Sequence, residues 1–250
     1  NNTCLGRYAG QGMTTGTDNI AIGEDSFGGT CTGSDNIALG RETLDAITSG
    51  SDNIALGHNA GGSLTTIGGN VYIGSSAGQY ITGGDNLAIG KNSMVGSSGS
   101  STGSLNIAIG YAALKDITTS TDNVVIGYYA GNAITTSGGN TLIGKRVGYK
   151  MTTGNSGSGN TAVGAEALWE LTTGTKNVAI GWEALKNSTT GEGVTCIGYQ
   201  AGTNFTTGFN SMVLGRMAQP SSATAQNEIT LGDTGITKFR IPGINFILKD

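Results

Sequence analysis

The chain is poor in proline, in charge and in long apolar runs. It has two prolines, and charged residues make up 12 %, about half of the share that is usual for a soluble domain. Glycine is abundant, at 45 of 250 residues, but it does not recur at every third position, which excludes a collagen triple helix. Apolar residues occur singly or in short runs, too short for a transmembrane helix or a signal-peptide core. We therefore expect a soluble chain without membrane insertion.

Positive charge is spread thinly along the sequence. The formal net charge is −4, and lysine and arginine form no basic patch or stripe. We expect no nucleic-acid partner, because such binding depends on clustered lysine and arginine side chains.

Three cysteines are too few and too scattered for a metal site. Cys4 and Cys196 both stand two residues before a repeated glycine, where small side chains prevail, so they are predicted to be buried. Cys31 falls in a threonine-rich turn, where a thiol can be exposed.

The chain has instead a repeat that runs from end to end. An aliphatic residue followed by glycine, most often within Asn-x-Ala-Ile-Gly, returns at spacings of 17 residues, with one spacing of 16 and two of 20. Such a period indicates a solenoid, in which each repeat forms one coil stacked on the next. The repeat glycines are Gly6, Gly23, Gly40, Gly57, Gly74, Gly90, Gly110, Gly127, Gly144, Gly164, Gly181, Gly198, Gly215 and Gly232.

The three residues before each repeat glycine are typical of a β-strand. The first and third are mostly Ile, Val or Leu, whereas the middle one is most often alanine. This alternation predicts a short strand with one bulky aliphatic face and one nearly flat face. We expect the aliphatic face to form the interior, and the flat alanine face to let another wall or another chain approach closely.

Asparagine stands four residues before the glycine in eleven repeats, for example at Asn19, Asn36 and Asn53. Stacked asparagines can form a hydrogen-bonded ladder along a rod, and asparagine tolerates the turn that must precede the strand. A second apolar position lies seven residues after the glycine and is followed by Thr-Thr-Gly or a close variant. Ala165–Leu171 and Trp182–Lys186 look locally helical, but they are too short for an independent helix.

The predicted fold is all-β, a parallel β-solenoid or β-roll of about 14 coils over residues 1–232, roughly 65 Å long. Two 20-residue repeats place their extra residues in loops within Gly96–Gly103 and Thr153–Gly159. Residues 233–250 leave the period and form an apolar lead-in to a further C-terminal region, expected to pack against a neighbouring chain or a downstream domain. Its apolar residues are Ile236, Phe239, Ile241, Ile244, Phe246 and Leu248.

The repeat resembles two kinds of fibrous protein. Asn19–Ser26, Asn53–Ala60 and Asn177–Ala184, together with Asn210–Gly215, are similar to the YadA-like β-roll of trimeric autotransporter adhesin heads and to the repeat shafts of bacteriophage tail fibres. The resemblance covers residues 1 to about 232 and implies a left-handed roll, three chains around one axis, and attachment to a cell surface. The segment Ile236–Leu248, with Arg-Ile-Pro-Gly at Arg240–Gly243, is similar to the lead-in before a cleaved fibre chaperone. The 17-residue period and the placement of the asparagine favour the phage-type fibre.

No enzymatic site is expected. Asp25 with Glu42, and Glu166 with Glu183, share a column in successive coils at about 5 Å, near the separation of retaining glycosidases. Neighbouring positions in that column are not acidic, however, and nothing predicts a desolvated pocket around them. His58 is the one histidine and lacks the other members of a triad or zinc site.

Two columns are candidates for binding. Asp18, Asp35 and Asp52 are stacked directly before the asparagines and are either solvated or share a cation. Aromatic residues replace charged ones in the two positions after the glycine, and such residues stack on sugars and anchor interfaces unless they pack between coils or chains. The aromatic candidates are Tyr111, Tyr128, Tyr129, Trp182 and Tyr199.

The sequence therefore predicts a non-enzymatic, extracellular, homotrimeric fibre segment without a cofactor. The first hypothesis is a phage tail fibre on the virion that binds a host cell-surface receptor or glycan. The alternative is a bacterial trimeric surface adhesin head. Two further alternatives are a glycan-degrading tailspike and an ice-binding solenoid, the latter because of the threonine pairs.

Overall fold

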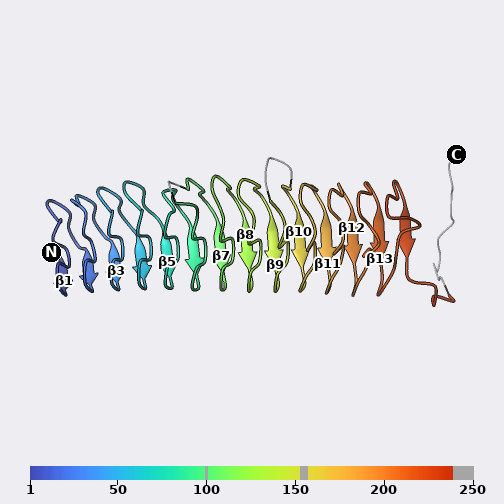
Figure 1. Cartoon of the computed structure of the whole chain (residues 1–250), viewed down its shortest axis with the longest axis horizontal. Coiled ribbons are helices and arrows are strands. Elements are labelled where there is room, and N and C mark those ends of the chain that lie inside the picture. The colour runs from blue at the N-terminus through green and yellow to red at the C-terminus, as the bar shows by residue number, and fades with distance from the viewer. Residues whose placement is uncertain (99–100, 153–156, 239–250) are drawn as a thin grey trace, which may run out of the picture.

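The computed structural model describes residues 1–98, 101–152 and 157–238. The chain winds into a row of coils, each of which contributes one three-residue strand to a single parallel sheet (Figure 1). Sheet order equals chain order, so the predicted all-β solenoid with a period of about 17 residues is confirmed. The strands are β1 (Thr3–Leu5), β2 (Ile20–Ile22), β3 (Ile37–Leu39), β4 (Ile54–Leu56), β5 (Val71–Ile73), β6 (Leu87–Ile89), β7 (Ile107–Ile109), β8 (Val124–Ile126), β9 (Thr141–Ile143), β10 (Thr161–Val163), β11 (Val178–Ile180), β12 (Thr195–Ile197), β13 (Met212–Leu214) and β14 (Ile229–Leu231).

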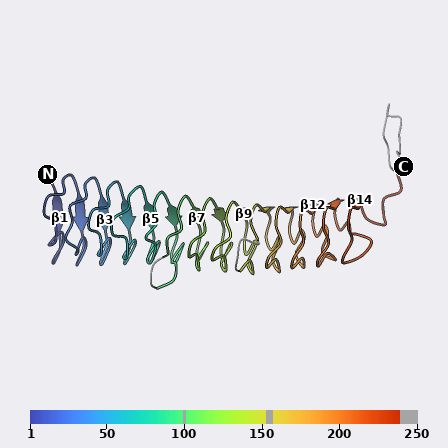
Figure 2. The ribbon, with the colours of Figure 1, turned by 90° about the horizontal axis from the view of Figure 1, so that it is seen from above.

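The register of the sheet is constant along the rod. Ala38 pairs with Ala21 on one side and with Ala55 on the other. The longer coils keep this register, because Ala88 pairs with Ala108 across the first insertion. The described residues of this insertion belong to a loop after β6 that stands out from the row of turns (Figure 2), and residues 99–100 of the predicted loop lie outside the described residues. Part of the second predicted loop, residues 153–156, lies outside the described residues, as do residues 239–250 of the lead-in.

Backbone geometry explains the invariant glycine after each strand. Gly74 has a φ of +133°, a value that L-residues rarely adopt. A Cβ on Gly74 would also lie 2.6 Å from the carbonyl carbon and oxygen of Gly90 in the next coil. Glycine is therefore required both by the conformation and by the close approach of neighbouring coils.

The two faces of the strands are reversed relative to the prediction. The middle residue points inward, and Ala38, Ala179 and their equivalents are fully buried. The first and third residues lie on the outer face of the sheet, where Leu39 is 43 % and Ile180 is 38 % exposed. The expectation of an aliphatic interior is therefore wrong, whereas the alanine face adjoins the second wall of the coil, one of the two neighbours expected for it. We call the outward first and third residues of β1–β14 the aliphatic face.

The narrow interior explains this orientation. The position four residues after the repeat glycine also points inward, and in most coils one of this residue and the middle strand residue is large and the other small. Ala55 with Gly61 is an exception, because side chains of the adjacent coils, Leu44 and Tyr72, fill the space beside Gly61. Ala38 shares its coil with Leu44, whereas Tyr72 shares its coil with Gly78. Leu142 likewise faces Gly148, on which a Cβ would lie 3.0 Å from Leu142 Cδ1. Each coil thus holds a limited volume between its walls, which two large side chains at these positions would exceed.

The predicted asparagine ladder is present and buried. Asn123 donates from Nδ2 to Asn106 Oδ1 at 2.9 Å, and its own Oδ1 accepts the backbone N–H and the Nδ2 of Asn140, both at 3.1 Å. The same pattern joins successive asparagines up to Asn177, whose Oδ1 accepts the N–H of Val194. Over the described part of the chain, no buried side-chain nitrogen or oxygen lacks a hydrogen-bond partner.

The second wall of each coil consists of turns. Its apolar residues seven positions after the glycine, such as Ile47, Ile117 and Leu171, are fully buried. Ala165–Leu171 and Trp182–Lys186 form turns, so repeat context overrides helical propensity as predicted. Within the described ranges no helix is long and apolar enough to cross a membrane.

One of the two cysteines that were predicted to be buried is exposed, and Cys31, for which exposure was left open, is buried. Cys196 is buried as predicted, and desolvation raises the pKa of its thiol to about 12. Cys31 is also fully buried, and its Sγ donates to the carbonyl of Gly33 at 3.6 Å. The prediction of a buried Cys4 is wrong: Cys4 is exposed, because it lies in β1, an edge strand of the sheet with a neighbouring coil on one side only.

Candidate aromatic binding surface

The five predicted aromatic contacts fall into two separate groups on the rod. Tyr111 stacks on Tyr128 with ring centroids 5.5 Å apart, and Tyr129 packs edge-on against Tyr128 at 4.6 Å. Trp182 packs against Tyr199 at 5.0 Å. In the portion of the chain that the structure describes, no ring contact joins the two groups. The alternative interpretation, packing between coils, is therefore observed.

Two further rings extend the first group. Tyr149 lies edge-on to Tyr129 at 6.2 Å and stacks on Trp169 at 5.0 Å. Both occupy the fifth position after a repeat glycine, a column that the sequence prediction did not consider. Aligning that column would have shown the two rings in adjacent coils. We call Tyr111, Tyr128, Tyr129, Tyr149 and Trp169 the ring row.

Packing leaves much of the aromatic surface accessible. Tyr128 and Trp182 are each 47 % exposed. A side-chain hydrogen bond with Tyr111 is the largest cause that raises the pKa of Tyr129, so phenolic hydroxyls converge at this point of the surface. The ring row thus combines a continuous apolar surface with hydroxyl groups that can donate or accept hydrogen bonds.

Cationic groups lie over the C-terminal end of the ring row. The Arg146 guanidinium is 5.4 Å from the Trp169 ring centroid, and Lys186 Nζ is 5.9 Å from it. Both distances are within the range of cation–π attraction. The ring row is therefore bordered by positive charge where it ends.

Lys186 also connects the carboxylates of Glu166 and Glu183, which share a column in successive coils. Its Nζ lies 2.9 Å from Glu166 and 2.6 Å from Glu183. Hydrogen bonds from Gln200 and from Lys186 lower the pKa of Glu183. The lowered pKa of Glu183 is the opposite of the raised pKa that a general acid requires.

The N-terminal acidic column is paired in a similar way. Glu42 lies 3.0 Å from Arg41 Nη1 and 3.3 Å from His58 Nε2. His58 is exposed and also lies 2.6 Å from Arg41 Nη2. These contacts join Arg41, Glu42 and His58 in one polar cluster at the surface.

The aspartate column has a conformational explanation. Asp18, Asp35 and Asp52 have φ values of 58°, 58° and 60°, in the left-handed region that aspartate, asparagine and glycine tolerate best. All three are exposed. Among the described residues, no group of three or more His, Cys, Asp or Glu side chains could hold a metal ion. The turn that precedes each strand therefore accounts for these aspartates, and the cation site stays a prediction.

The threonine pairs have divided roles. Thr118 Oγ1 donates to the carbonyl of Thr135 at 2.9 Å, and Thr172 Oγ1 donates to that of Thr189 at 3.0 Å. The second threonines, Thr119 and Thr173, are exposed. The first member of each pair joins neighbouring coils, so only one outward row remains for the ice-binding alternative.

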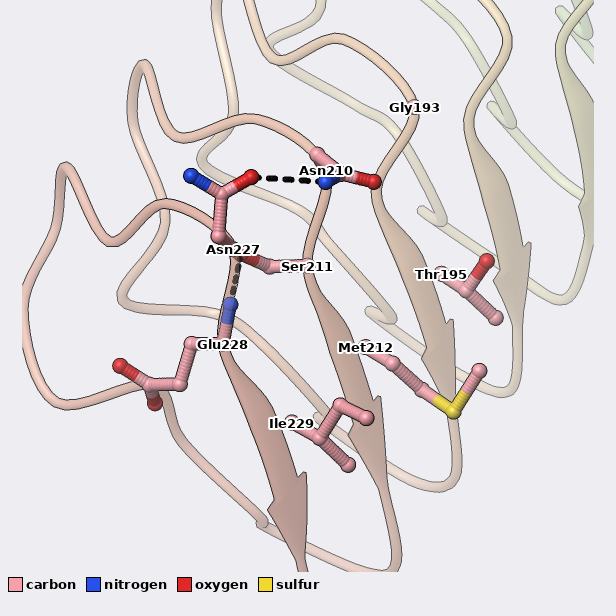
Figure 3. A pocket seen from close by; sticks show the side chains of 8 residues that line it. All are labelled: Gly193, Thr195, Asn210, Ser211, Met212, Asn227, Glu228 and Ile229. Atoms are coloured by element: carbon pink, nitrogen blue, oxygen red, sulfur yellow. Dashed lines mark hydrogen bonds between the residues drawn. The ribbon is translucent and has the colours of Figure 1, made fainter. Parts of the chain in front are cut away.

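A groove of about 340 Å³ lies at the C-terminal end of the sheet (Figure 3). The asparagine ladder has ended there, and Ser211 and Glu228 occupy its positions. Asn210 Nδ2 donates to Asn227 Oδ1 at 2.7 Å. Met212 and Ile229, which belong to the aliphatic face, form the apolar wall. The groove therefore continues the aliphatic face under a polar rim.

No known family model, curated protein or solved structure matches this chain.

Proposed function

We propose that the chain is a structural and adhesive segment of a homotrimeric extracellular fibre, foremost a phage tail fibre that mediates attachment to a host cell. The observation that carries this proposal is the aliphatic face, which runs along the whole sheet. Leu39, Ile143 and Ile197, at widely separated coils, are each between 37 % and 43 % exposed. Their neighbours in the sheet cover their sides, so this exposure is the outward surface of each side chain.

The size of the aliphatic face supports association. A strip about 65 Å long and roughly 10 Å wide covers on the order of 650 Å². Monomers rarely expose apolar patches above a few hundred Å², and a standard interface removes about 800 Å² of surface from each partner. The strip is therefore of the size that a protein interface requires.

The regularity of the face favours a second copy of the same chain as its partner. Aliphatic side chains recur at one rung spacing, about 4.8 Å, over 14 strands. A parallel copy has the same spacing, so its side chains can stay in register from end to end. Closed symmetry is the usual solution for identical chains, and the repeat resemblance supplies the number three. The same resemblance and the exposed aromatic residues support the attachment role.

The mass of the assembly tests the trimer. The chain has a mass of 25.1 kDa, and native mass spectrometry is expected to give three times that value. Replacing Ile126 and Ile180 on the aliphatic face with aspartate is expected to give monomers. Thr119→Asp/Thr173→Asp, with the same charge change on exposed turn residues, is the matched control. A wild-type monomer would contradict the proposal.

Cell binding separates the phage fibre from the adhesin head. Fluorescently labelled assembly is expected to bind some strains of a bacterial panel and not animal cells or extracellular-matrix proteins. Binding confined to animal cells or matrix would favour the bacterial adhesin instead. Release of reducing ends from bacterial polysaccharide would favour the tailspike.

A further inference from the structure

We propose that the ring row and the cations beside it form a binding surface for an anionic polysaccharide, which specifies the ligand class within the proposed attachment function and rests on it. The surface comprises Tyr128, Tyr129, Lys145, Arg146, Tyr149 and Trp169. These residues lie in the consecutive coils that begin with β8, β9 and β10.

Positive charge is locally concentrated in this part of an acidic chain. Lys145, Arg146 and Lys150 fall within six residues that contain no acidic residue, although the chain carries a net charge of −4. Lys150 is neutralised by Glu170 at 2.7 Å. Within the described segments, Lys145 and Arg146 have no carboxylate partner. Two cations therefore remain available to an external anion.

The two cations follow directly on two tyrosines. Ile143 pairs with Ile126 in the sheet, which places Lys145 and Arg146 one coil beyond Tyr128 and Tyr129 at equivalent positions. The backbone N–H of Arg146 donates to the carbonyl of Tyr128 at 2.9 Å. Tyr149 and Trp169 continue the rings on the other side of Arg146, whose guanidinium lies over Trp169. The cations are thus flanked by aromatic rings along the rod.

This combination fits a sugar polymer with spaced anionic groups. Aromatic rings contact the apolar faces of sugar rings, and the unpaired guanidinium and ammonium groups bind carboxylate, sulfate or phosphate oxygens. A nucleic acid would need a longer series of cations for its continuous phosphates. Two unpaired cations beside a row of aromatic rings instead fit a polysaccharide in which only some of the sugar units carry an anionic group.

Binding of defined polymers to the full 250-residue assembly tests the proposal. Isothermal titration calorimetry with polygalacturonate, dextran sulfate, uncharged dextran and oligothymidylate compares carboxylate, sulfate, neutral and nucleic-acid probes. We expect at least one acidic polysaccharide to bind, more weakly at high salt, and dextran not to bind. Lys145→Ala/Arg146→Ala is expected to weaken that binding about tenfold or more. The control Lys91→Ala/Arg216→Ala removes two exposed cations that directly follow repeat glycines elsewhere and is expected to have no effect.

Several results would overturn the proposal: no binding of either acidic polysaccharide, equal binding of dextran, equal or tighter binding of oligothymidylate, or equal loss in both double variants. Native mass spectrometry of the same samples measures the oligomeric state independently, so the polysaccharide test and the trimer test can fail separately. An intact trimer that binds no acidic polysaccharide contradicts the polysaccharide surface alone. A monomer that binds one contradicts the trimer alone.

Discussion

The ring of Tyr72 occupies the space that a side chain on Gly78 would need. A Cβ on Gly78 would lie 2.6 Å from Tyr72 Cδ1 and Cζ, and Tyr72 is fully buried. Other coils hold alanine and leucine at the same two positions, as in Ala38 and Leu44. The two residues therefore form one packing unit inside the coil.

Exchanging the large and the small side chain between positions 72 and 78 tests this packing unit. Tyr72→Ala alone is expected to leave a cavity and to cost about 3–5 kcal/mol. Gly78→Leu alone is expected to overpack the coil by about 1–3 kcal/mol or more. The double variant restores the Ala and Leu combination of the other coils. It should therefore be more stable than the less stable single variant, and its loss of unfolding free energy should be smaller than the sum of the two single losses. Thermal unfolding followed by circular dichroism measures all three, and simple additivity would contradict the packing unit.

Removing one asparagine from the ladder should loosen the coils on both sides. Asn123→Leu leaves the buried Asn140 N–H without its acceptor, whereas Asn106 Oδ1 loses the Nδ2 donor but keeps the backbone N–H of residue 123. Each buried group left unpaired costs about 1–3 kcal/mol. We expect a lower unfolding temperature and faster amide exchange at Asn140. Asn187→Leu, which removes one exposed bond to the carbonyl of Thr203, is the control and should have a smaller effect.

Thiol labelling should distinguish the first coil from the interior. Cys4 is exposed, whereas Cys31 and Cys196 are buried and have raised pKa values because of desolvation. Since the thiolate is the reactive form, a maleimide at pH 7.5 is expected to label Cys4 quickly and the other two only on unfolding. Peptide mass spectrometry identifies the labelled sites. Fast labelling of Cys31 would contradict its burial in the second wall.

Alkaline pH should destabilise the rod through Cys196. Its pKa is raised by burial from an ordinary value of 9.0 to about 12. Above pH 9 the thiol of the unfolded state loses its proton, whereas the thiol of the folded state keeps it. The free energy of unfolding therefore falls as pH rises from 9 toward 12. The slope is up to about 1.4 kcal/mol per pH unit. The unfolding temperature of Cys196→Ala should fall less steeply than wild type between pH 9 and 11.

Tyr72 acts in the same direction, because burial also raises the pKa of its hydroxyl. Tyr72→Phe removes that group with little change in volume, so it should flatten the alkaline slope further when combined with Cys196→Ala. An unchanged slope in the combined variant would show that other groups control alkaline unfolding.

The repeat predicts the fold because its period fixes both strand spacing and coil length. The three-residue strands, the ladder through Asn123 and the turn at Trp182–Lys186 all follow from columns of equivalent residues. Alternation alone does not identify the buried face, because period two is the same whichever side is inside. The signal that identifies the buried face is the inverse relation between the size of the middle strand residue and that of the residue four positions after the glycine. The sequence shows it in the pairs Tyr72 with Gly78 and Ala38 with Leu44. It shows that the middle strand residue points inward.

The aromatic surface was only partly predictable for a different reason. Tyr128 and Tyr129 adjoin the repeat glycine, where a substitution in the column is obvious. Tyr149 and Trp169 lie across a turn, and their contact with the first group depends on how the turn folds back. Distances between side chains on different turns do not follow from spacing along the chain.

The constant register of the sheet also sets how the chain would respond to force. Each interior strand is bonded only to the strand before and the strand after it, so tension on the two termini would detach coils singly from an end. A detached 17-residue coil would lengthen from one rung to an extended chain, a gain of about 50 Å. Single-molecule stretching of one chain would therefore give a ladder of nearly equal extension steps, lengthened by about 10 Å at each 20-residue coil.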